Sequence, residues 1–146
     1  MEVKDFLKNG PRRIITARED TPVPEAMALL IDNRISCLPV VNDATELVGI
    51  ISDKDIFRAT FENPLGFTKT VVGSLMTTDL IVGLTSDKFD YIAGVMTKNR
   101  IRHVPIVENK RLVGLLSLGD IVKSHLSNME IENRYLKKYI EDSYPG

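Results

Sequence analysis

Hydrophobic positions follow one pattern twice along the chain. Apolar residues recur at spacings of three and four from Val23 to Leu30 and again from Phe89 to Met96, and each pattern predicts an amphipathic helix. Two short apolar runs follow each helix, LPVV with LVGIIS and then VPIV with LVGLLS. Such runs predict buried β-strands, with proline at the entry of LPVV and VPIV. The segments after each serine, DKDIFRATF and LGDIVKSHL, are predicted to be helical.

Capping residues predict where each of the two amphipathic helices begins. Thr21 is the expected N-cap of the earlier helix, with Pro22 at its first position. The later helix is expected to begin around Ser86 and Asp87.

The duplication extends to individual residues. NRISCLPVV (33–41) returns as NRIRHVPIV (99–107), 66 positions later, with Asn, Arg, Ile, Pro and the final Val unchanged. GIISDKD (49–55) returns as GLLSLGD (114–120), only 65 positions later. One residue is therefore lost from the polar stretch between the two apolar runs, which is how a hairpin loop absorbs a change of length.

These patterns predict an α+β fold made of two halves. Each half is expected to run strand, helix, strand, strand, helix, and the halves to pack through their sheets about an approximate two-fold axis. A half of this size would be marginally stable alone. The expected boundaries are 1–60 for the first half, 61–70 for a connecting segment, 71–126 for the second half and 127–146 for a C-terminal helix.

The C-terminal segment predicts an amphipathic helix. Apolar residues and one asparagine step by three and four, at Leu126, Met129, Asn133, Leu136 and Ile140. Such a helix either packs back on its own chain or makes a dimer contact, and both interpretations stay open.

Composition narrows the functional class. The formal net charge is −1, so no global field favours nucleic acid or an anionic membrane, and nucleic-acid binding is unlikely. Cys37 is the single cysteine, which excludes an internal disulfide framework and fits a reducing compartment. The N-terminal sequence lacks a signal-peptide pattern, and no apolar run is long enough to span a bilayer. A cytoplasmic protein without membrane contact is expected.

The chain lacks the usual signatures of catalysis. It has no G-x-S-x-G elbow and no Walker loop, and with two histidines and one cysteine it has no cluster at metal spacing. We expect no catalytic residues, no metal site and no catalytic cofactor.

The duplicated S-x-x-D motif allows two interpretations. In a capping box, the serine accepts from a backbone N–H and the acid three positions later reaches back to the serine N–H. In a ligand site, the helix N-terminus and the serine bind a phosphate, and the aspartate binds the two hydroxyls of a ribose. The two interpretations are compatible for both Ser52 with Asp55 and Ser117 with Asp120.

Over about residues 1–126 the chain resembles the cystathionine-β-synthase (CBS) domain, which occurs in tandem pairs called Bateman modules. The resemblance is carried by VGSLMT (72–77), a weaker VKDFL (3–7), the two NRIxxxP segments and the two G-h-h-S-x-x-D endings. It implies a cleft between the halves that binds AMP, ADP, ATP, S-adenosylmethionine, NAD(H) or a cyclic dinucleotide. It also implies a stand-alone regulatory module that assembles as a homodimer.

The resemblance implies two clefts, each shared between the halves. The residues expected in the first are Ser52, Asp55, Ile50, Ile81, Ile101, Arg102 and His103. The residues expected in the second are Ser117, Asp120, Leu115, Arg13, Ile15, Ile35, Ser36 and Cys37, with Arg12 nearby.

The two clefts are not expected to be equivalent. Arg102 and His103 replace Ser36 and Cys37 of the other copy, and arginine suits a phosphate. The first cleft is therefore favoured for a charged nucleotide, although Arg102 and His103 could instead form a solvated loop tip. Cys37 is interpreted as a buried, inert thiol beside the second cleft.

The resulting hypothesis is a non-enzymatic sensor of an adenosine nucleotide, with AMP, ADP or ATP favoured over NAD(H) or S-adenosylmethionine, that signals to an unknown protein partner. The alternative is a structural dimerisation module without a physiological nucleotide ligand.

Overall fold

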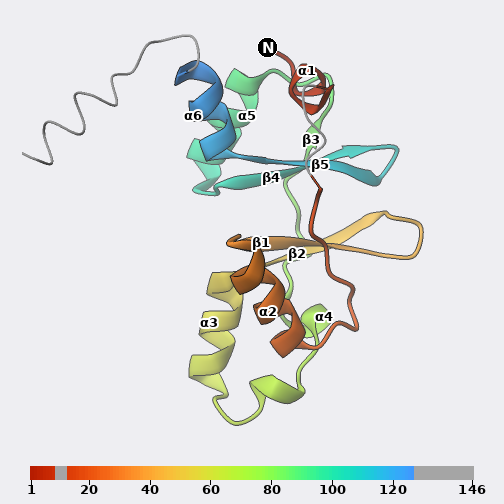
Figure 1. Ribbon diagram of the computed structural model, residues 1–146, viewed down its shortest axis with the longest axis vertical. Helices are drawn as coiled ribbons and strands as arrows, with labels where there is room; N and C mark the ends of the chain where they lie inside the picture. The colour runs from red at the N-terminus through yellow and green to blue at the C-terminus, as the bar shows by residue number, and fades with distance from the viewer. Residues whose placement is uncertain (9–12, 127–146) are drawn as a thin grey trace, which may run out of the picture.

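The computed structural model describes residues 1–8 and 13–126 and has the α+β architecture in two halves that the repeat predicts (Figure 1). The elements, in chain order, are α1 (Val3–Lys8), α2 (Val23–Asn33), β1 (Cys37–Val41), β2 (Leu47–Ser52), α3 (Asp53–Glu62), the 3₁₀ turn η1 (Phe67–Lys69), α4 (Val72–Leu75), β3 (Gly83–Leu84), α5 (Phe89–Asn99), β4 (His103–Glu108), β5 (Arg111–Ser117) and α6 (Leu118–Leu126). Arg12 and the helix predicted over 127–146 lie outside the described residues.

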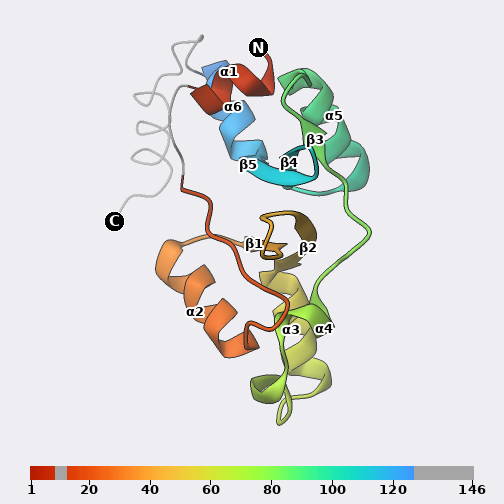
Figure 2. The same ribbon diagram turned by 90° about the vertical axis from the view of Figure 1, so that its right-hand side faces the viewer.

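The sheets of the two halves face each other, and the helices lie on their outer sides (Figures 1 and 2). In the first half, β1 and β2 form an antiparallel hairpin. In the second half, β4 and β5 form the equivalent hairpin, and β3 pairs parallel to β4. Both hairpins shift register at the same place, between Val40 and Val41 and between Ile106 and Val107, so the repeat preserves even an irregularity.

The strand expected at the start of the first half is reduced to a single bridge. Ala17 donates its N–H to Pro39 at 2.9 Å and accepts from Val41 at 3.0 Å, as in a parallel ladder. The ladder then stops, because the Arg18 N–H turns to donate to the Thr21 hydroxyl at 2.9 Å.

That bond also explains why Thr21 is not the N-cap that the sequence predicts, and the N-cap of the later helix lies one residue beyond the predicted Ser86 and Asp87. The hydroxyl of Thr21 accepts from Arg18 rather than capping α2, whose N-cap is Pro22. In the second half the Asp87 carboxylate accepts from the Leu84 N–H at 2.7 Å, and the N-cap of α5 is Lys88.

The prediction that proline stands at the entry of its strand is also wrong. Pro39 is the central residue of β1 and lies opposite Ile50 of β2. The N–H and C=O of Ile50 both bond to Thr77 on the other side, at 3.0 and 2.8 Å. The missing donor of Pro39 therefore removes no hydrogen bond from the ladder.

The loop that changes length between the copies is a hairpin loop in both, as predicted. In the second half, Asn109 and Lys110 form a two-residue turn with φ of 52° and 68°, as a type I′ turn requires. In the first half the connection is longer, and the Asn42 side chain accepts from the N–H groups of Ala44 and Glu46.

The tips of the two hairpins are bonded to each other. Leu47 donates its N–H to the Lys110 carbonyl, and Leu112 donates to the Thr45 carbonyl, each at 3.1 Å. These bonds join the sheets of the two halves at one end.

Each half has its own hydrophobic core, and each core contains a helix from the sequence segment that precedes the other half. Val72 of α4 is fully buried in the core of the first half, with Val40 and Ile51. Val3 of α1 is fully buried in the core of the second half, where Phe6 packs edge-on against Phe89 with ring centroids 5.6 Å apart. Figure 2 shows α1 in the same half as α5 and α6, and α4 beside α3. The halves are thus tied together by this exchange of helices.

We predict that Val72→Ala lowers the free energy of unfolding by about 1–3 kcal/mol, because it leaves a cavity in the core of the first half, to which the segment preceding the second half contributes Val72. Val71→Ala is the matched control, since Val71 is 39% exposed and should change stability by less than about 0.5 kcal/mol. Urea unfolding measures both. Equal losses for the two variants would contradict the exchanged packing.

Candidate functional site

Both S-x-x-D motifs form capping boxes at the start of a helix. Ser52 ends β2 and caps α3: its hydroxyl accepts from the Asp55 N–H at 3.2 Å, and its own N–H donates to the Asp55 carboxylate at 2.9 Å. The corresponding distances between Ser117 and Asp120 are 3.0 and 2.9 Å. The local interpretation of the motif therefore holds in both halves. Asp55 is half-buried, whereas Asp120 is only 7% exposed.

Backbone bonds fix the first turn of each capped helix to the loop that follows the preceding helix. The Asp53 N–H donates to the Ser36 carbonyl at 2.9 Å, and the Leu118 N–H donates to the Arg102 carbonyl at 2.8 Å. The NRI loops thus border both helix N-termini at fixed positions.

The first cleft is a cavity of about 500 Å³ that begins at the N-terminus of α3. It contains all seven residues that the sequence analysis places together there: Ser52, Asp55, Ile50, Ile81, Ile101, Arg102 and His103. It is also lined by Ser36, Cys37, Asp53, Lys54, Thr77, Asp79, Leu80, Arg100 and Pro105.

The second cleft is a cavity of about 580 Å³ at the N-terminus of α6. It contains all eight residues expected there: Ser117, Asp120, Leu115, Arg13, Ile15, Ile35, Ser36 and Cys37. It is also lined by Phe6, Leu7, Ile14, Arg34, His103, Val113 and Gly114. Both volumes lie in the range of small-molecule sites.

Three side chains border both clefts, although the sequence analysis assigned each to one. Ser36, Cys37 and His103 line the two cavities in common. Cys37 and His103 occupy equivalent positions in the repeat and lie opposite Ser52 and Ser117 in their hairpins. The clefts are therefore neighbours that share a wall along the boundary between the halves.

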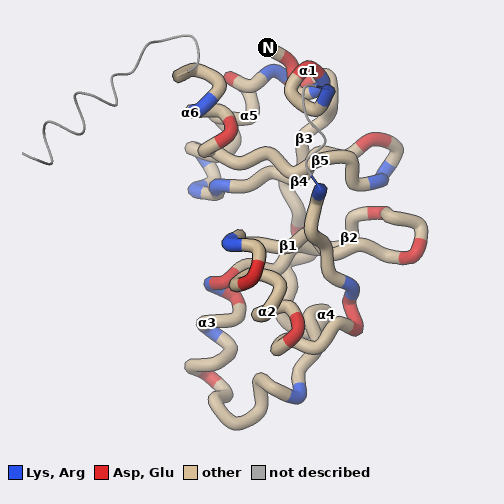
Figure 3. The backbone as a smooth tube through the Cα atoms, viewed as in Figure 1, with Lys and Arg blue, Asp and Glu red and all other residues tan. Residues whose placement is uncertain are grey.

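Charge is distributed unequally between the clefts. The first is lined by the cations Lys54, Arg100 and Arg102 and by the carboxylates of Asp53, Asp55 and Asp79. The second is lined by Arg13 and Arg34 and by the carboxylate of Asp120. Figure 3 shows basic positions of both halves gathered at one edge of the boundary between them.

The shared wall is electrically neutral near pH 7. Burial lowers the pKa of the His103 imidazole from its usual value; Asp120 and Asp53 act in the opposite direction, and Arg102 adds to the lowering. Burial raises the pKa of the Cys37 thiol to about 12, with a contribution from Asp53. Cys37 is 5% exposed, so the buried thiol interpretation is confirmed.

The sequence analysis missed several lining residues. Arg34 and Arg100 belong to the repeated NRI segments, so their duplication was the available signal. Thr77 lies in VGSLMT, and Phe6 and Leu7 lie in VKDFL, segments that only the exchange of helices brings to the clefts.

Residues 1–8 and 13–126 have neither a metal-binding cluster nor a membrane-spanning helix. These residues contain no group of three or more histidine, cysteine, aspartate or glutamate side chains that could hold a metal ion. Their helices include none with the length and apolarity needed to cross a bilayer.

The chain belongs to the CBS-domain family. The family model matches twice, over residues 3–62 and 72–127, and so covers both halves of the repeat. The CBS domain-containing protein YhcV of Bacillus subtilis is 30% identical over 127 residues, which is 86% of each chain.

Solved structures of CBS pairs share this architecture. CBSX2 of Arabidopsis thaliana, crystallised in complex with AMP, matches with a TM-score of 0.76 at 29% identity over 87% of this chain and 97% of that one. The CBS domain pair of protein MJ0100, in complex with 5′-methylthioadenosine and S-adenosyl-L-methionine, matches with a TM-score of 0.76 at 32% identity over 88% and 98%.

Some curated relatives are much longer than this chain. It spans 39% of the length of one Methanocaldococcus jannaschii protein and 22% of another, L-aspartate semialdehyde sulfurtransferase.

We predict that acid destabilises the fold partly through His103. Because the pKa of His103 is lower in the folded state, the unfolded chain binds a proton at this histidine more readily than the folded chain does. The neutral, buried imidazole therefore stabilises the fold fully above about pH 6.5. This stabilisation is lost as the pH falls through the folded-state pKa. His103→Gln should therefore lose less stability than wild type between pH 7 and pH 5 in urea unfolding. The exposed His125→Gln is the control for loss of an imidazole. An unchanged pH dependence in His103→Gln would contradict the prediction.

Proposed function

We propose that the protein is a non-enzymatic regulatory module that binds an adenosine nucleotide in the clefts between its two CBS domains. The observation that carries this proposal is the composition of each cleft. Each combines the capped serine and aspartate of one half with apolar residues and an arginine from the other. A ligand seated there touches both halves and can shift the angle between them.

Each class of residue has a role that suits one part of a nucleotide. Asp55 and Asp120 have carboxylate oxygens for the two ribose hydroxyls, at the cost of loosening their capping boxes. The helix N-termini and the serines Ser52 and Ser117 suit a phosphate. In the first cleft Ile50, Ile81 and Ile101 would enclose the adenine, and in the second cleft Leu115, Ile15 and Ile35 would do so.

What related proteins bind supports an adenosine ligand. AMP in CBSX2, and 5′-methylthioadenosine with S-adenosyl-L-methionine in MJ0100, have adenosine in common. We favour AMP, ADP or ATP, because basic side chains line both clefts, and keep NAD(H) and S-adenosylmethionine as further candidates. The first cleft is our choice for the phosphate-bearing ligand, since the cations Lys54, Arg100 and Arg102 border it, whereas Arg13 and Arg34 border the second.

Catalysis is not part of the proposal. The buried Cys37 carries a protonated thiol, because burial raises its pKa to about 12, so it is not an activated nucleophile. A reduced, buried cysteine fits a cytoplasmic location. The regulated partner protein is unknown, and turnover of ATP or NADH by the pure protein would overturn the non-enzymatic assignment.

The module is further proposed to act as a homodimer through α2 and α3. Ile31, Phe57 and Phe61 are 71%, 76% and 83% exposed. Ile31 and Phe57 line one groove of about 410 Å³ between the two helices. Large apolar side chains gathered on one face are typical of an interface. The same surface supports the alternative function, a dimerisation module without a physiological nucleotide.

We predict that AMP raises the unfolding temperature by several degrees when its concentration is about a hundred times its Kd. A thermal-shift panel of AMP, ADP, ATP, NADH, S-adenosylmethionine and cyclic dinucleotides measures this. If none moves the midpoint by about one degree at about millimolar concentration, the dimerisation module replaces the sensor. A partner whose capture ignores nucleotide would support the same alternative.

Within that panel, Asp55→Ala should reduce the shift produced by AMP more than Asp120→Ala does. Both variants lose a capping bond, so the shift is measured from each variant's own unliganded midpoint. The control is Asp87→Ala. This variant also loses a carboxylate that accepts a backbone hydrogen bond, but Asp87 does not line either cleft. Equal effects of the two cleft variants would reject the preference for the first cleft.

We predict that Phe57→Glu converts a dimer into a monomer, because an unpaired charge in an apolar interface is unfavourable. Arg58→Glu changes charge at the next position of α3 and should leave the dimer intact. Sedimentation velocity measures both. A wild-type monomer, or a dimeric Phe57→Glu variant, would contradict the proposed interface.

A further inference from the structure

Two arginines at equivalent positions adopt a backbone conformation that arginine rarely adopts. Arg34 follows α2 with φ 53° and ψ 47°, and Arg100 follows α5 with φ 54° and ψ 43°, both in the left-handed region. Glycine or asparagine usually occupies such a C-cap, because a β-carbon there is strained. The chain places arginine at this position in both halves.

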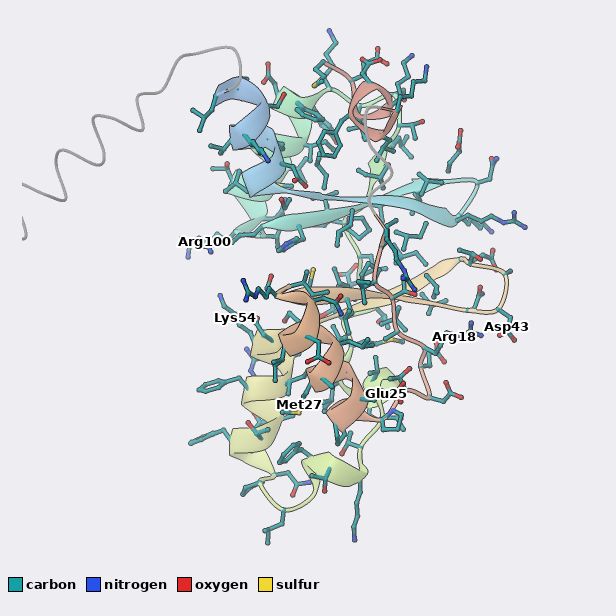
Figure 4. All side chains as sticks on the ribbon, in the orientation of Figure 1. Arg18, Glu25, Met27, Asp43, Lys54 and Arg100 are labelled. Carbon is teal, nitrogen blue, oxygen red and sulfur yellow. The ribbon has the colours of Figure 1, made fainter. Side chains whose placement is uncertain are left out.

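Neither arginine makes a polar contact with a described residue that explains its presence, although Arg34 also borders the groove between α2 and α3. Among the described residues, no hydrogen bond or ion pair involves the guanidinium of Arg34 or Arg100, and both side chains are exposed. Arg18, by contrast, pairs with Asp43 on the opposite edge of the molecule (Figure 4). Strain without an internal contact to offset it is typical of a residue kept for binding.

Each arginine lines the cleft whose serine and aspartate belong to the other half. Arg34, at the end of α2 in the first half, lines the cleft of Ser117 and Asp120. Arg100, at the end of α5 in the second half, lines the cleft of Ser52 and Asp55. Figure 4 shows Arg100 and Lys54, which line the same cleft, on opposite sides of the boundary between the halves.

We infer that Arg34 and Arg100 recognise the phosphate of the nucleotide whose ribose is bound by the opposite half. The inference rests on the proposed function and deepens it. A guanidinium presents paired donors to phosphate oxygens, and the helix N-terminus across the cleft favours the same anion. In the second cleft Ser36 and Cys37 stand where the first cleft has Arg102 and His103. Arg34 would therefore supply the second cleft with a cation for the phosphate that this loop does not provide.

This assignment has a consequence for ligand choice. A nucleoside without phosphate would be bound through its ribose and base and would lack the contact to either arginine. A nucleoside monophosphate would be bound by both halves at once. The two arginines would therefore discriminate AMP from adenosine, and the ligand class that ties the halves together is a nucleoside phosphate.

Glycine substitution tests the role of the guanidinium without imposing backbone strain. In Arg34→Gly and Arg100→Gly the left-handed conformation stays favourable, so circular dichroism and the unfolding midpoint should match wild type. To study one cleft at a time, Arg100→Gly is combined with Asp120→Ala and Arg34→Gly with Asp55→Ala. Each is compared by calorimetry with its single aspartate variant.

The expected result is a loss of AMP affinity of about tenfold, with adenosine affinity changed by less than about twofold. Thr45→Gly is the control, because it relieves backbone strain at another left-handed residue, with φ 65°, that lines neither cleft. It should change neither the AMP affinity nor the adenosine affinity. Equal losses for AMP and adenosine, or no loss for either, would overturn the inference while leaving nucleotide binding intact. Failure of the wild-type protein to bind either compound would overturn the proposed function and, with it, the inference.

Discussion

Neither half of this protein has a complete hydrophobic core of its own sequence, and that constraint governs the rest of the structure. Val72 fills the core below one sheet and Val3 the core above the other, each carried by a short helix that precedes the opposite half. Because a half of this size would be marginal alone, the exchanged helices convert two weak units into one cooperative one. They also bring the chain across the boundary twice, once before each sheet.

The clefts are a by-product of that arrangement. Two sheets that face each other and are crossed by connecting segments leave room at the ends of β2 and β5, where the capped helices begin. The same serine and aspartate that terminate a strand and start a helix also border the cavity. If the proposed nucleotide binds there, it competes with the capping bonds for the same serine and aspartate atoms, and ligand binding is coupled to the stability of these helix ends.

The sequence alone was sufficient for the duplicated features, because a repeat reports the same physical solution twice. The repeat predicted the two halves, and the resemblance to CBS domains then placed Ser52 with Ile101 and Ser117 with Ile35, residues far apart in the chain, in the clefts that they line. The sequence did not predict the helix N-caps, because a polar side chain near a helix start can either cap the helix or accept a hydrogen bond in the preceding turn. Thr21 and Asp87 have side chains suited to cap a helix, yet both accept a nearer N–H in the preceding turn. The exchange of α1 and α4 was also unpredictable, since the hydrophobic pattern of a short helix does not specify which of two similar cores it enters.

The backbone bonds between the hairpin tips restrict how this molecule can move. Leu47 and Lys110 are joined near the start of β2 and β5, whereas the clefts lie at the far ends of these strands, about 20 Å away at the usual rise per residue. A rotation of one half about these bonds, too small to break them, would produce its largest displacement at the opposite ends of the strands, where α3 and α6 begin.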